Sequence, residues 1–154
     1  MKKSQRTLMF ALVGFVAVGL IASVIALSVR IGKVETTRTI GSSEYKIGVL
    51  DDTSGKEPEE QENVGIFMKD YVLVDGLKCE LAEDAKVEYS INFYDEDYKF
   101  ISVVDYEGDF DGSEIPDGAK YARIEIRPTA DKDGKVTLLE KTDYAKMLTV
   151  TVSK

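Results

Sequence analysis

The segment VEYSINFY, residues 87–94, decides the fold class of this chain, because apolar and polar side chains alternate along it. Successive side chains of a β-strand point to opposite faces of a sheet, so the pattern predicts a strand with one buried face. The segment YARIEIR, residues 121–127, alternates in the same way. We expect its alanine and two isoleucines to face the core, and Glu125 to face solvent.

Short β-rich segments recur along the rest of the chain, separated by turn sequences such as DEDYK, PDGAK and DKDGK. Strands are expected at residues 45–50, 64–68, 71–74, 77–81, 87–94, 100–106, 121–127, 136–139 and 147–152. Residues 140–146 fit one helical turn. Eight or nine short strands without a long helical period predict an all-β fold, an antiparallel β-sandwich or jelly roll.

An apolar run without a charge, LMFALVGFVAVGLIASVIALSV, occupies residues 8–29. At a rise of about 1.5 Å per residue it spans roughly the hydrocarbon core of a bilayer, so it predicts one transmembrane helix. Three basic side chains precede the run and two follow it closely, which predicts a cytoplasmic tail at residues 1–7 and an exported remainder. The alternative is a signal peptide that is cleaved near Ala26-Leu27-Ser28.

The remainder divides into a polar linker, residues 30–44, and one extracellular domain, residues 45–154. Residues 1–33 hold five basic and no acidic side chains, so the other 121 residues hold 15 basic and 28 acidic ones, a net charge of −13. Such an acidic domain repels nucleic acid phosphates, so no nucleic acid partner is expected. The predicted location is the cell membrane, with a single span.

The composition argues against an enzyme. The chain has no histidine, which excludes a Ser-His-Asp or Cys-His catalytic pair and any histidine metal ligand. Its one cysteine, Cys79, alternates with leucines and is expected in a buried strand. No glycine-rich phosphate loop is present. The absence of disulfides and of N-glycosylation sequons fits a bacterial surface.

Two segments resemble a known module. They are FYDEDYKFIS at residues 93–102 and FDGSEIPDGAKYARIEI at residues 110–126. They resemble a jelly-roll domain that recurs in secreted proteins and phage tail proteins of Gram-positive bacteria. The resemblance implies an architecture like that of carbohydrate-binding modules. It carries no ligand-binding residue over to this chain, so it supports the fold more than the function.

Tyrosines are the candidate ligand-binding residues, because sugar rings stack on flat aromatic side chains. Tyr94, Tyr98 and Tyr106 are expected at polar-facing or loop positions around the DEDYK hairpin and the loop after it. A candidate calcium site follows the hairpin, because Ca²⁺ takes six to eight oxygen ligands. Its acidic residues are Asp105, Glu107, Asp109 and Asp111. The alternative is a solvated acidic loop, and no other cofactor is expected.

The predicted function is therefore a membrane-anchored extracellular binding module for glycan or cell wall. The alternative is a structural or assembly protein of the cell envelope that docks another protein. An exposed aromatic surface favours the first, and a large exposed apolar patch favours the second.

Overall fold

The computed structural model describes residues 37–58 and 64–153. The chain divides into two units, Met1–Glu35 and Thr36–Lys154, and all described residues belong to the second. The predicted tail at 1–7 and the predicted membrane span at 8–29 lie outside the described residues. Among those that are described, no helix has the length and apolar character needed to cross a membrane.

The regular elements of the described part of the chain are almost all strands, as predicted. In chain order its elements are β1 (Thr37–Thr39), the 3₁₀ turn η1 (Ser42–Glu44), β2 (Tyr45–Ile47), β3 (Ile66–Met68), β4 (Val72–Leu73), β5 (Lys78–Leu81), β6 (Val87–Tyr94), β7 (Phe100–Tyr106), β8 (Tyr121–Pro128), α2 (Lys141–Met147) and β9 (Leu148–Ser153). The helical turn expected at 140–146 is confirmed as α2. The strand expected at 136–139 is wrong, because Val136 makes only an isolated bridge to Ala130.

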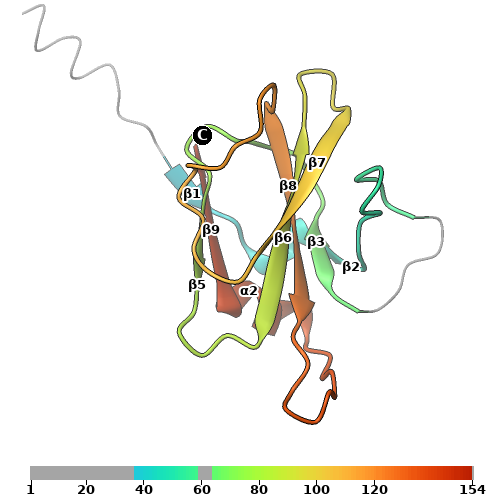
Figure 1. Ribbon diagram of the computed structural model, residues 1–154. Coiled ribbons are helices and arrows are strands. Elements are labelled where there is room, and N and C mark those ends of the chain that lie inside the picture. The colour runs from blue at the N-terminus through green and yellow to red at the C-terminus, as the bar shows by residue number, and fades with distance from the viewer. Residues whose placement is uncertain (1–36, 59–63, 154) are drawn as a thin grey trace, which may run out of the picture. The chain divides into compact units, whose positions relative to one another are not determined.

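Two antiparallel sheets face each other across the core (Figure 1). The smaller sheet has the order β1-β9-β5, and the larger has the order β2-β3-β8-β6-β7, with β4 also paired to β8. Strands β6 and β8 pair over their whole length, from Val87 opposite Pro128 to Tyr94 opposite Tyr121. These two central strands carry the alternating segments from which the fold was predicted.

The core lies between the two inner faces, and the predicted alternation is confirmed there. The buried side chains of β6 and β8 on this face are Val87, Tyr89, Ile91, Phe93, Ala122, Ile124 and Ile126. Leu148, Val150 and Val152 of β9 oppose them, together with Cys79 of β5. Cys79 is a free, fully buried thiol, and burial raises its pKa to about 12.

The folded unit begins earlier than the predicted boundary at residue 45. Strand β1 pairs with β9, and Ile40 is buried in the core with its N–H bonded to the carbonyl of Val150 at 2.9 Å. Residues 37–44, which the sequence analysis assigns to the linker, therefore belong to the domain. Their polar sequence, TRTIGSSE, has no alternation that would predict an edge strand.

Candidate functional site

A loop at residues 48–58, which we call the covering loop, lies on the outer face of the larger sheet (Figure 1). The N–H of Leu50 donates to Glu125 of β8 at 2.6 Å. The hydroxyl of Tyr94 on β6 donates to the carbonyl of Gly55 at 2.5 Å. Gly55 has φ +63, and a Cβ there would lie 2.5 Å from Phe100 and 2.6 Å from the Tyr94 hydroxyl. The close approach of the loop to the sheet therefore requires glycine at this position.

Arg123 of β8 is buried beneath this loop rather than exposed. Its Nε donates to the carbonyl of Met68 at 2.9 Å, and its Nη2 lies 3.1 Å from a carboxylate oxygen of Glu57. The guanidinium also lies over the rings of Phe67 and Tyr71, 5.1 and 5.3 Å from their centroids. These contacts compensate the burial of a charge that would otherwise be costly.

Glu125 is completely buried, so the expectation that it faces solvent is wrong. Besides the bond from Leu50, its carboxylate accepts a hydrogen bond from Nε of Arg127, and Arg127 in turn pairs with Asp52 at 3.2 Å. Burial raises the pKa of Glu125 above its ordinary value of 4.5, although its hydrogen bonds act in the opposite direction. The covering loop causes the difference, because it removes water from a face that alternation alone assigns to solvent.

The structure brings tyrosines together at the end of the sheet that carries the β6–β7 turn. The ring of Tyr71 lies 4.8 Å from Tyr94 and 4.9 Å from Tyr98. Tyr98 also stacks on Tyr121, with centroids 4.5 Å apart and ring planes inclined by 16°. Tyr94 is buried, whereas Tyr98 is 51% exposed. We call Tyr71, Tyr94, Tyr98 and Tyr121 the tyrosine cluster.

Tyr106, the third predicted tyrosine, does not belong to this cluster. It lies on the inner face of β7, stacks on Tyr89 at 5.5 Å and contacts Phe110 at 5.2 Å. It pairs with Tyr89 at the end of β7 that is remote from the β6–β7 turn. Of the three predicted tyrosines, the structure therefore brings Tyr94 and Tyr98 together, beside Tyr71 and Tyr121, and places Tyr106 elsewhere. The sequence analysis did not single out Tyr71 and Tyr121 as ligand-binding residues, although Tyr121 is the first residue of the alternating segment in β8.

The acidic residues of the predicted calcium site serve separate roles. Asp105 is exposed on the outer face of β7, opposite Ser90, and Glu107 is exposed just after the strand. The carboxylate of Asp109 accepts the N–H of Leu81 at 2.8 Å, and that of Asp111 accepts the N–H of Ser113 at 2.9 Å. Within residues 37–58 and 64–153, no three acidic or cysteine side chains are grouped in a way that would hold a metal ion.

Two hollows lie away from the tyrosine cluster. One, of about 350 Å³, is lined on β6, β7 and β8 by residues that include Glu88, Asp105 and Arg127. The other, of about 670 Å³, lies at the base of the loop that follows β8 and is lined by residues that include Lys86 and Met147. Both mix charges of opposite sign, so neither selects a ligand by charge alone.

No protein-family model matches the chain, and no curated protein or solved structure is significantly similar to it. The function is therefore argued from the residues of the site.

Proposed function

We propose that the chain is a membrane-anchored extracellular binding module that recognises a glycan, such as that of the cell wall, through its tyrosine cluster. The exposed ring of Tyr98, stacked on Tyr121, is the observation that supports this proposal. A sugar ring has an apolar face that packs on an aromatic ring, and hydroxyls at its edge that reach polar neighbours. The antiparallel sandwich agrees with the jelly-roll resemblance, and residues 8–29 are proposed to hold it at the membrane.

The charge of the domain narrows the class of glycan. The exposed charged residues of the turn that carries Tyr98 are Glu96, Asp97 and Lys99, and Lys99 pairs with Asp97 at 2.9 Å. No unpaired basic side chain is thus provided by this turn for an anionic sugar, and the acidic domain repels polyanions at longer range. A neutral sugar fits these surroundings best.

A glycan array probed with the full-length chain in detergent micelles tests the proposal. We expect binding to neutral oligosaccharides that persists at about 1 M salt, where the Debye length falls to about 3 Å and charge contacts are screened. Tyr106→Phe is the matched control, because Tyr106 lies on the inner face of the sheet and this change should leave binding intact. An array without a bound glycan would contradict the proposal.

Docking of another envelope protein is the second candidate function. The loop after β8 projects beyond the sheets (Figure 1), and its Val136 and Leu138 are about half exposed. Exposed apolar side chains on a projecting loop are common in protein contacts. Val136→Ser together with Leu138→Ser should then abolish capture of a protease-sensitive envelope component, whereas Tyr98→Ala should not.

A further inference from the structure

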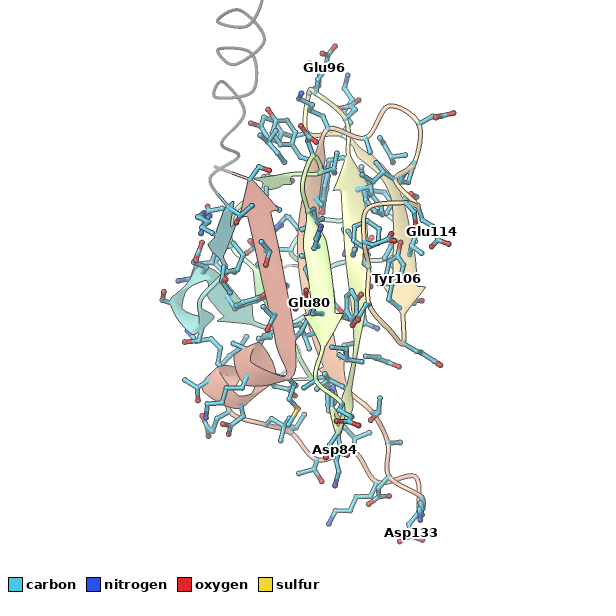
Figure 2. The ribbon with its side chains drawn as sticks, turned by 90° about the vertical axis from the view of Figure 1, so that its left-hand side faces the viewer. Glu80, Asp84, Glu96, Tyr106, Glu114 and Asp133 are labelled. Carbon is cyan, nitrogen blue, oxygen red and sulfur yellow. The ribbon has the colours of Figure 1, made fainter. Side chains whose placement is uncertain are left out.

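Two turns of this protein have the same sequence pattern and the same hydrogen bonds. They are DEDYK at residues 95–99, between β6 and β7, and DKDGK at residues 131–135, after β8. In each turn the carboxylate of the first aspartate accepts the N–H groups of the third and fifth residues, at 2.8–2.9 Å in the first turn and 2.8–3.0 Å in the second. Figure 2 shows Glu96 and Asp133 of these turns at opposite ends of the domain.

The fourth residue of both turns has a left-handed backbone. In the second turn it is Gly134, with φ +74, and in the first turn it is Tyr98, with φ +60. Glycine adopts this conformation without strain, whereas the Cβ of any other residue approaches the following carbonyl oxygen. Among the residues that the structure describes, Tyr98 is the only one other than glycine with a positive φ. A bulky side chain at such a position points to a function that outweighs the strain.

The ring of Tyr98 has neighbours that hold it in place. One face lies on Tyr121, and Tyr71 approaches at 4.9 Å with its plane tilted by 57°. Tyr98 is still about half exposed to solvent. In the second turn, by contrast, a Cβ on Gly134 would have no atom within 4 Å. The second turn makes the same hydrogen bonds with glycine at this position, so the tyrosine is not needed to close the first.

We propose that Tyr98 is the residue that contacts the ligand, kept at a glycine position for that contact, and that Tyr121 is a positioning residue that supports its ring. This inference rests on the proposed function and specifies its site. The ligand class is a neutral sugar whose apolar ring face covers one tyrosine ring. A protein partner fits less well, because the exposed, charged Asp97 and Lys99 flank Tyr98 in the turn, whereas the centre of a protein interface is depleted of charged residues.

The test compares Tyr98→Gly and Tyr98→Ala with the wild-type full-length chain in detergent micelles. The probe is an array of neutral oligosaccharides that includes the hexamer of N-acetylglucosamine. We expect both variants to bind at least about tenfold more weakly, because both lack the ring. We expect Tyr98→Gly to melt at the wild-type Tm or above it, because glycine relieves the strained backbone. Tyr98→Ala should melt below the wild-type Tm, because alanine keeps the strain and loses the ring contacts.

Three further variants distinguish contact with the ligand from support of the Tyr98 ring and from the stability of the turn. Tyr121→Leu should weaken binding, because the flat support for the Tyr98 ring is lost. Tyr121→Phe keeps a flat ring and should bind as well as the wild type. Gly134→Ala introduces the same strain in the remote turn, so it should lower Tm without weakening binding.

The remaining outcomes would overturn either this inference alone or the proposed function as well. Unchanged binding by Tyr98→Gly would overturn this inference and leave the proposed function standing. A Tm that falls equally in Tyr98→Gly and Tyr98→Ala would show that the ring serves stability, and would also overturn it. A wild-type chain that binds no oligosaccharide, or only a protease-sensitive envelope component, would overturn both the inference and the proposed function.

Discussion

The N–H of Leu50 donates a 2.6 Å hydrogen bond to the carboxylate of Glu125, a residue 75 positions further along the chain. This bond joins the covering loop to the central strand β8. It buries part of the outer face of the larger sheet, in addition to the inner face that packs against β9 and β5. The buried polar residues there, Arg123 and Glu125, are therefore part of the folded interior, and substitutions of them should behave as core substitutions.

Glu125→Lys should strongly destabilise the domain. The change leaves the Leu50 N–H without its acceptor and places an ammonium beside Arg127 in a buried site. We expect a loss of about 3–5 kcal/mol, against a total stability of about 5–15 kcal/mol for a typical domain. Urea denaturation measures the loss. Glu80→Lys, on an exposed position of β5, is the matched control and should change stability by less than about 0.5 kcal/mol. Equal effects would mean that the covering loop does not bury Glu125.

The free energy of unfolding should depend on pH through the protonation of Glu125. Burial raises its pKa in the folded state above 4.5, so the unfolded chain loses this proton at a lower pH than the folded one. Its contribution to stability is therefore complete below the unfolded pKa and is lost as pH rises through the folded pKa. Denaturation of the wild type and of Glu125→Gln at about pH 4 and about pH 7 measures this effect. The wild type should lose stability relative to the variant as pH rises, and the opposite trend would contradict the raised pKa.

Gly55→Ala should displace the covering loop. The added Cβ would meet Phe100 and the Tyr94 hydroxyl at 2.5 and 2.6 Å, on a backbone that already has a positive φ. We expect a loss of about 1–3 kcal/mol and faster hydrogen exchange at the Leu50 amide. Gly118→Ala is the control, because it has the same kind of backbone but no atom within 4 Å of its Cβ. It should cost about 1 kcal/mol and leave the Leu50 amide protected.

The predicted topology can be tested in intact cells. Because more basic side chains precede residues 8–29 than closely follow them, a carboxy-terminal tag should be exposed outside the membrane. Protease added to intact cells should remove the tag from this chain. The same treatment should leave the tag on a cytoplasmic control protein intact. Protection of the tag would reverse the predicted orientation. Release of the whole domain into the medium would instead favour the cleaved signal peptide.

The alternation of residues 87–94 and 121–127 was sufficient to predict the strands β6 and β8 and the side chains that they bury in the core. The DEDYK turn was also predictable, because aspartate and its neighbours form tight turns by local hydrogen bonds. Each of these features depends on residues that are close in the sequence, and the period of two is a direct consequence of strand geometry.

The outer face of the larger sheet was decided only by tertiary structure. Nothing in YARIEIR shows that Glu125 is buried, because the group that covers it, Leu50, comes from a distant and highly charged loop. The tyrosine cluster likewise joins Tyr71, Tyr98 and Tyr121 from three parts of the chain. Alternation tells which side chains share a face, but what packs on that face depends on contacts between residues far apart in sequence. Local patterns therefore determined the sheet and its core, and long-range packing determined the candidate site.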